Sequence, residues 1–131
     1  MGKRTTSRRL AMQAIYQSEL SNTSIDEALT NLFGEEELAE DTREFTKKLA
    51  EGVLGKKEDL DSKIKEFSKN WEIGRISMIN KAILMLALYE LIYEKDTPKA
   101  VVINEALELA KRYSDPESAK FINGILGSAV V

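Results

Sequence analysis

An apolar stretch at residues 82–93, AILMLALYELIY, constrains the fold of this chain more than any other feature. Eleven of its twelve residues are apolar, and Glu90 is the single exception. A helix at a protein surface has one apolar stripe, whereas a helix that is apolar on all sides is buried on all sides. The stretch is too short to span a bilayer, which needs about 20 apolar residues. We therefore expect a buried central helix packed against amphipathic helices, and no membrane contact.

The remaining sequence has the periodicity and the end signals of further helices. Apolar residues recur three and four positions apart, and no segment alternates with a period of two for long enough to form a strand. Ser24 and Glu27 have the spacing of a capping box, and Gly34 and Pro98 mark helix ends. The prediction is an all-α, single-domain bundle of about seven helices. Six of them are expected at about residues 5–21, 24–33, 57–69, 82–93, 101–113 and 117–128. The other helix runs from the acidic stretch 35–41 to residue 55, and residues 71–76 form a connector.

The composition excludes the commonest kinds of catalytic and metal site. The chain has neither cysteine nor histidine, so it lacks a thiol nucleophile, a cysteine zinc site and the commonest general base. It also lacks the glycine-rich loops that hold nucleotide phosphates. Glu90 either acts from a buried position, as a proton donor or a helix clamp, or points outward or pairs with a lysine or a backbone amide. We expect no active site, no metal and no cofactor.

Positive charge is concentrated at the N-terminus, although the net charge is only −3. The first twelve residues hold four basic side chains and no acid, whereas residues 24–44 hold eight acids and one arginine. Helical spacing places Arg9 and Tyr16 on one face, which combines a cation for RNA phosphates with a ring that stacks on bases. A solvated end without function and a core position for Tyr16 are the alternatives. The inward face of this helix is expected to consist of Leu10, Ala11, Ala14 and Ile15, and the last helix is expected to place Phe121, Ile122, Ile125 and Leu126 toward the core.

Three blocks of sequence, in order along residues 5–128, resemble the NusB family of bacterial antitermination factors. The first is RRLAMQAIYQ at residues 8–17, and the second is KAILMLALYEL at residues 81–91. The third is VINEALELAKRY at residues 102–113, followed by KFINGIL at residues 120–126. The second block departs from the family pattern at Met85, where the family has arginine, so packing is expected to replace any contact of that arginine.

The resemblance implies a function in binding rather than a reaction. NusB proteins form a heterodimer with NusE, a small-subunit ribosomal protein. The pair binds the boxA element of nascent RNA and helps RNA polymerase to read through ribosomal RNA operons. The family fold, two packed helical subdomains, agrees with the bundle expected over residues 1–131. Some members form a homodimer that covers the RNA surface, and nothing in this sequence favours either state.

Positions that match the family motifs imply an RNA-binding set and one partner contact. The RNA-binding set consists of the matched residues Arg8, Arg9, Tyr16, Lys120 and Phe121, to which Lys3 and Arg4 add electrostatic attraction. Its N-terminal members supply cations and a stacking ring, whereas Lys120 and Phe121 match a Lys-Phe pair at the RNA-binding edge. Glu117 matches an acidic position that senses NusE or RNA. For Phe121, a core position with Ile125 one turn away is the alternative.

Two other functions stay open on the sequence. NusB-like domains occur at the N-terminus of ribosomal RNA cytosine methyltransferases, although this chain has neither a nucleotide-binding loop nor a cysteine to attack the base. A helical adaptor whose basic end is incidental would keep its protein partner after neutralisation of Arg8 and Arg9. The basic N-terminus lacks the apolar region of a secretory signal, so we expect a cytoplasmic location.

Overall fold

The computed structural model describes residues 3–68 and 76–130, which form seven α-helices and contain no strand. Of Lys3, only the backbone is described. The expected all-α fold is confirmed, whereas the predicted connector lies, apart from Ile76, outside the described residues. The helices are α1 (Lys3–Ser21), α2 (Ile25–Phe33), α3 (Glu40–Gly55), α4 (Lys57–Phe67), α5 (Met78–Tyr93), α6 (Lys99–Tyr113) and α7 (Pro116–Ala129).

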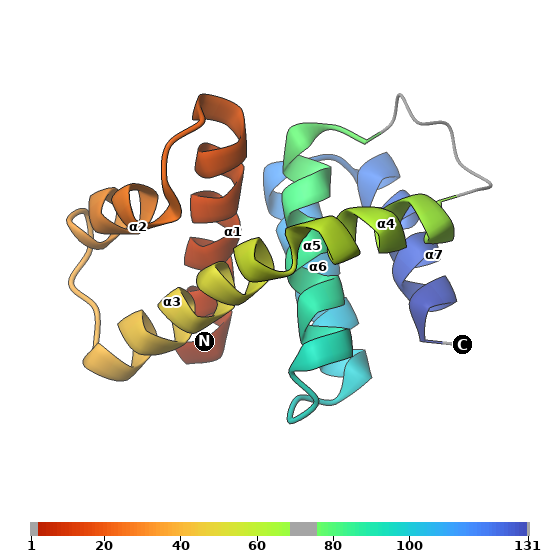
Figure 1. The fold of residues 1–131 in the computed structure, drawn as a ribbon. Helices are drawn as coiled ribbons and strands as arrows, with labels where there is room; N and C mark the ends of the chain where they lie inside the picture. Colours follow the sequence, from red (N-terminus) through yellow and green to blue (C-terminus); the bar gives the residue numbers. More distant parts are fainter. Residues whose placement is uncertain (1–2, 69–75, 131) are drawn as a thin grey trace.

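The helices form two groups that pack side by side (Figure 1). Helices α1, α2 and α3 contact one another in the first group, and α4, α5, α6 and α7 form the second. Helices α3 and α4 follow each other across the molecule, with only Lys56 between them, and so connect the groups. Helix α5 contacts α1 and α3 of the first group and the three other helices of the second. It is therefore the central helix that the apolar stretch predicts.

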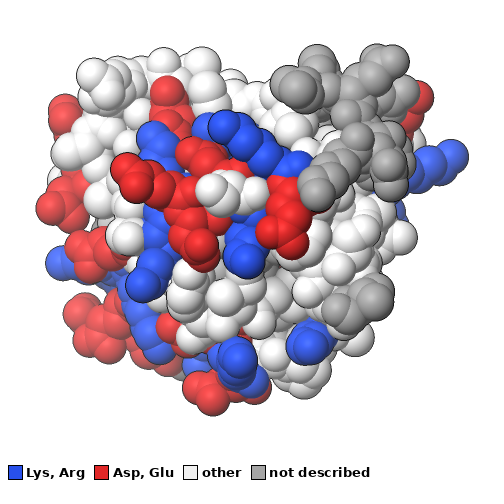
Figure 2. Space-filling view, turned by 45° about the vertical axis from the view of Figure 1, so that its right-hand side comes forward, with Lys and Arg blue, Asp and Glu red and all other residues white. Residues whose placement is uncertain are grey.

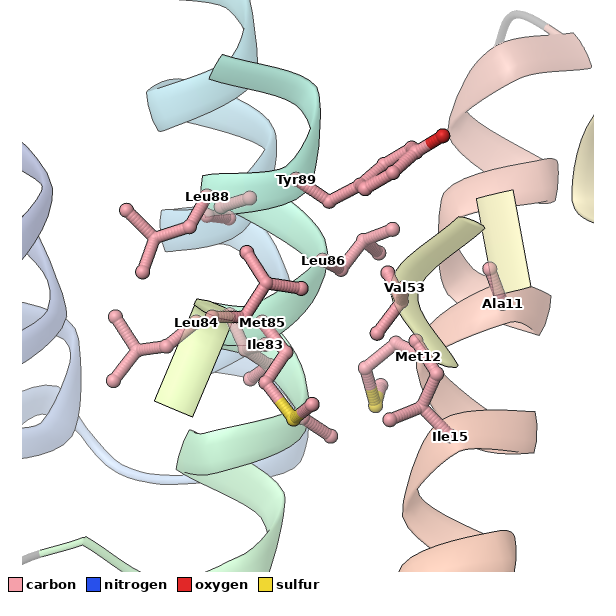
Figure 3. Packing of buried hydrophobic residues seen from close by; sticks show 14 of the residues in the cluster. Ala11, Met12, Ile15, Val53, Ile83, Leu84, Met85, Leu86, Leu88 and Tyr89 are labelled. Carbon is pink, nitrogen blue, oxygen red and sulfur yellow. The ribbon is translucent and has the colours of Figure 1, made fainter. Parts of the chain in front are cut away.

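Helix α5 is buried over more than two turns, since every residue from Ala82 to Glu90 is buried. Figure 3 shows Met85 and Leu86 among the side chains that extend toward α1 and α3, where Met12 and Val53 lie. Met85 is fully buried, so packing replaces the family's arginine at this position, as expected. No helix in the described parts of the chain is long and apolar enough to cross a membrane.

The predicted inward faces of the first and last helices are confirmed. In α1 and α7 these predicted residues are at most 1% exposed: Leu10, Ala11, Ala14, Ile15, Phe121, Ile122, Ile125 and Leu126. Apolar side chains at these intervals share one side of a helix, so each helix buries one stripe against the core. The sequence interpretation omits Met12, which is fully buried as well.

The helix ends follow local capping chemistry. Helix α5 starts four residues before the predicted position, because the Ser77 hydroxyl accepts a hydrogen bond from the N–H of Asn80 at 3.2 Å. Helix α2 ends before Gly34, as expected, and the Ser24 hydroxyl accepts a hydrogen bond from the N–H of Glu27 at 3.2 Å. A side-chain acceptor of this kind satisfies one of the N–H groups that a helix start leaves unpaired.

We expect Ser24→Ala to lower the free energy of unfolding by about 1 kcal/mol, because the N–H of Glu27 loses its acceptor. Urea unfolding followed by circular dichroism measures this loss. Ser62→Ala is the matched control, since Ser62 is exposed inside α4 and alanine favours a helix there by up to about 0.5 kcal/mol. Equal losses in the two variants would contradict a capping role for Ser24.

Candidate nucleic-acid interface

The first arginine of α1, Arg4, is exposed and lies against α3. Its guanidinium carbon is 3.8 Å from the centre of the Phe45 ring. The ring quadrupole attracts a cation that lies over its face. Phe45 therefore orients the Arg4 side chain along the surface of α3 while leaving it accessible to a ligand.

Arg9 lies at the surface of α1, where its side chain is 20% exposed. Its Nη2 donates hydrogen bonds to both carboxylate oxygens of Glu36, at 2.9 and 3.1 Å. Its Nη1 donates to Oε1 of Gln13, one turn along the helix, at 3.3 Å. Glu36 belongs to residues 34–39, which connect α2 to α3. The predicted RNA-binding cation is thus paired with a carboxylate of its own chain.

Tyr16 is half-buried and packs against the core beneath α1. The residue is also partly exposed, so it combines a core contact with access to solvent. Its predicted stacking on RNA bases stays a prediction.

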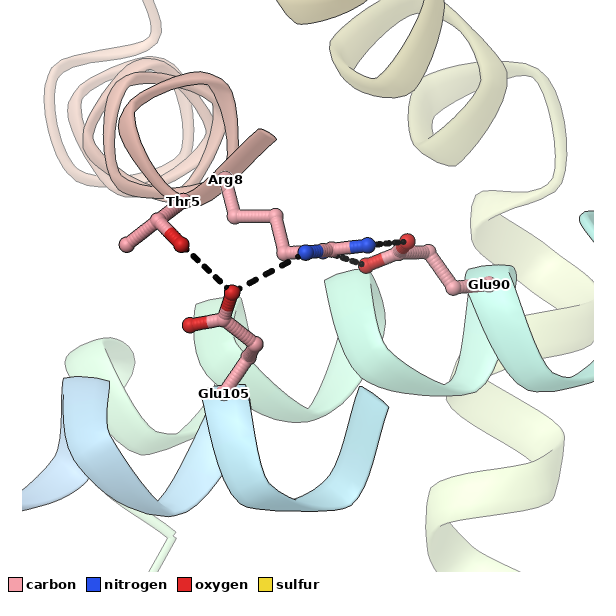
Figure 4. Close-up of polar contacts among 4 residues, drawn as sticks. All are labelled: Thr5, Arg8, Glu90 and Glu105. Atoms are coloured by element: carbon pink, nitrogen blue, oxygen red, sulfur yellow. Dashed lines mark hydrogen bonds and ion pairs between the residues drawn. The ribbon is translucent and has the colours of Figure 1, made fainter. Parts of the chain in front are cut away.

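Arg8 points into the molecule, toward α5 and α6 (Figure 4). Its Nε and Nη2 donate to the two carboxylate oxygens of Glu90, at 2.8 and 2.9 Å. Its Nη1 donates to Oε1 of Glu105 at 3.1 Å, and the same oxygen accepts a hydrogen bond from the Thr5 hydroxyl at 2.7 Å. The Arg8 and Glu90 side chains are 5% and 2% exposed. This network ties α1 to α5 and α6.

Burial opposes the positive charge of Arg8, but its hydrogen bonds and charge interactions with Glu90 and Glu105 outweigh burial and raise the pKa of Arg8. A forked arginine–carboxylate pair is among the strongest protein hydrogen-bond arrangements. Each of the three guanidinium nitrogens donates to a carboxylate, and the side chain is only 5% exposed, so Arg8 acts here as a contact between helices. The structure thus gives Arg8 a structural role, and its predicted RNA contact stays a prediction.

The same network resolves the alternatives for Glu90. It is buried and accepts hydrogen bonds across helices, as the helix-clamp interpretation states, but its partner is an arginine rather than a lysine or a backbone amide. Glu105, which shares this arginine, is missed by the sequence reasoning. The only sequence signal for Glu105 is its position in the third family block, residues 102–113, which says nothing about its partner.

The three predicted residues of α7 lie around the start of that helix. Lys120 and Glu117 are exposed, whereas Phe121 is 1% exposed and belongs to the core, which favours the core alternative. Phe121, Ser77 and Glu117 are among the residues that line an open groove of about 480 Å³ between the starts of α5 and α7. The exposed polar groups of this region can contact a ligand, while Phe121 supports the helix from within.

A second groove, of about 260 Å³, runs between the N-terminal half of α1 and the last turns of α6. Arg9 and Arg112 line it together with Glu105 and Glu108. Arg112 is exposed, and its guanidinium carbon lies 5.2 Å from the centre of the Tyr113 ring. The sequence reasoning omits Arg112 because it lies about 100 residues from the basic N-terminus.

The structure does not bring the two predicted sets of residues together. One set lies on α1 and the other on α7, and these two helices begin at opposite ends of the molecule (Figure 1). Figure 2 shows the side of the molecule that carries α4 and α7, where basic and acidic side chains alternate and no patch of one sign forms. On this face the charges are therefore mixed.

A comparison with known families matches residues 5–130 to the NusB family. The chain belongs to the NusB family. Transcription antitermination protein NusB of Acetivibrio thermocellus is 46% identical over 99% of this chain and 89% of its own length. Transcription antitermination protein NusB of Clostridium botulinum (strain Kyoto / Type A2) is 41% identical over 97% and 99%.

The fold agrees with solved NusB structures. In a crystal structure of antitermination factors NusB and NusE with double-stranded RNA, one chain is 27% identical to this one, with a TM-score of 0.89. The similarity covers 98% of this chain and 96% of that one. The NusB-like arrangement of two helical subdomains that the sequence predicts is therefore confirmed.

Proposed function

We propose that this protein is a transcription antitermination factor that binds boxA RNA together with NusE and catalyses no reaction. The observation that carries the proposal is the similarity, over nearly the whole chain, to a structure of NusB and NusE in complex with double-stranded RNA. In this role the protein joins the complex that keeps RNA polymerase transcribing ribosomal RNA operons, and it acts in the cytoplasm.

Within this proposal, the accessible residues of α1 contact the RNA. Arg9 and Arg4 supply cations for phosphates, and the exposed part of Tyr16 supplies a ring for base stacking. Lys3 adds positive charge, and Lys120 contributes a cation at the start of α7. Arg8 and Phe121 support these surfaces from the interior.

Fluorescence anisotropy of labelled boxA RNA, with and without NusE, tests the proposal. We expect sequence-dependent binding that strengthens when NusE is added, and weaker binding by Arg9→Gln. Loss of one phosphate contact should lower the slope of log affinity against log salt by about 0.7, the value for single strands. Lys65→Gln removes one charge from an exposed position on α4 and should leave the slope unchanged.

Three outcomes would contradict the proposal when they occur together. They are equal affinity for boxA and a scrambled RNA, no effect of NusE, and equal salt slopes for Arg9→Gln and the original protein. An adaptor that binds only proteins would then account better for the fold. A homodimer that hides the RNA surface would show itself as weaker RNA binding at higher protein concentration, and sedimentation would detect it.

A further inference from the structure

The segment that connects α2 to α3 places negative charge beside the proposed RNA contact on α1. Three consecutive exposed glutamates, Glu35, Glu36 and Glu37, follow Gly34. Among the described residues, only the second of them has an ion pair, and its partner is Arg9. Helices α2 and α3 both pack against α1, so the segment between them lies next to the helix that carries Arg9.

The geometry of this pair makes it a direct competitor of RNA. Glu36 presents two oxygens to Nη2 of Arg9, and a phosphate presents the same kind of oxygen pair to a guanidinium. Gln13 accepts a hydrogen bond from Nη1 and so restrains the arginine along α1. A phosphate that takes Nη2 must therefore displace the Glu36 carboxylate.

The ion pair between Arg9 and Glu36 is exposed enough for a phosphate to replace the carboxylate. The side chains of Arg9 and Glu36 are 20% and 38% exposed, unlike the buried pair between Arg8 and Glu90. Ion pairs at the surface contribute little stability in water. A polyanion with several phosphates can therefore replace one carboxylate at a moderate cost in affinity.

We propose that Glu36 occupies Arg9 in the free protein and competes with RNA phosphate, so that the 34–39 segment sets the affinity for RNA. This inference rests on the proposed function. Glu36 acts on RNA through Arg9 and is an affinity-determining residue without itself contacting RNA.

The test compares Glu36→Gln with Glu37→Gln by anisotropy of boxA RNA at low salt. Both variants remove one negative charge from the same exposed segment, but only the first frees Arg9. We expect Glu36→Gln to bind about two- to five-fold more tightly than Glu37→Gln, the range that one exposed ion pair supports. The difference should shrink at high salt, which screens both the pair and the phosphate contacts.

The same two substitutions in an Arg9→Gln background provide the decisive control. Without the arginine there is nothing to release, so both variants should have equal affinity. Equal affinities in the original background, or a difference that persists without Arg9, would overturn the inference while leaving RNA binding in place. Absence of RNA binding in every variant would overturn the proposed function and this inference with it. Thermal unfolding of each variant verifies that all are folded.

Discussion

Glu90→Gln is expected to lower the free energy of unfolding by about 3 kcal/mol, the low end of the cost of breaking a buried ion pair. Glutamine keeps the size of the side chain, but it removes the charge that compensates Arg8 and turns an N–H group toward one of its donors. Glu105 still compensates part of the arginine charge, which keeps the loss near that end. Urea unfolding followed by circular dichroism measures the change.

Replacing both members of the pair separates the buried charge from the packing. The double variant Arg8→Met/Glu90→Leu removes both buried charges, and only Glu105, whose side chain is 19% exposed, loses its arginine. Apolar side chains of similar volume often replace buried ion pairs at little cost. We expect it to lose less than half of what the two single variants lose together. Additive losses would show that the two side chains act independently.

An exposed ion pair supplies the matched control for this substitution. Glu108 pairs with Lys111 one turn along α6, at 3.6 Å, and both side chains are 61% exposed. Glu108→Gln should change the free energy of unfolding by no more than about 0.5 kcal/mol. If Glu90→Gln behaved like Glu108→Gln, the network of Figure 4 would contribute nothing to stability.

The sequence predicts the amphipathic helices well because burial of one face leaves a periodic signal, and it predicts the central position of α5 because that stretch is apolar on all sides. Leu10 and Ile15 of α1 show this, since their spacing alone places them in the core. The start of α5 is missed because Ser77, the cap, lies outside the apolar stretch. Local patterns therefore predict which elements form, and less well where each begins.

The candidate site was harder to predict, because partners distant in sequence decide what each cation does. Arg8 and Arg9 are adjacent, but successive residues of a helix point about 100° apart. One therefore faces Glu90, 82 positions away along the chain, and the other faces Glu36 at the surface. Nothing in the basic N-terminal motif distinguishes a buried structural arginine from an accessible one.

A buried acid is nevertheless a usable signal. Glu90 is the one charge in an apolar helix, and a buried charge needs a partner of opposite sign. The basic residues of the amphipathic helices that cover this helix are then the first candidates. Glu90 therefore predicts that a basic residue of another helix is buried beside it, although it does not say which one; the structure shows that it is Arg8.

The second large effect is expected from Gly52→Ala, which should lower the free energy of unfolding by about 2 kcal/mol. Gly52 lies inside α3, where a Cβ atom would overlap Oη and Cζ of Tyr89 and lie 2.8 Å from Cε1. The ring is only 9% exposed, and burial, reinforced by the Glu94 carboxylate, raises the pKa of the Tyr89 hydroxyl. The ring is thus held where the added methyl group would be, and the overlap outweighs the helix propensity that alanine gains.

Gly127→Ala isolates that gain in propensity, because a Cβ at Gly127 in α7 meets no atom within 4 Å. This substitution should raise the free energy of unfolding by about 0.5–1 kcal/mol, opposite in sign to Gly52→Ala. Introducing Gly52→Ala into a Tyr89→Leu background removes the ring and should abolish the loss. If both glycine variants raised the free energy of unfolding, the Tyr89 ring would have to move aside freely. Changes of opposite sign would show that α3 and α5 approach so closely because residue 52 has no side chain.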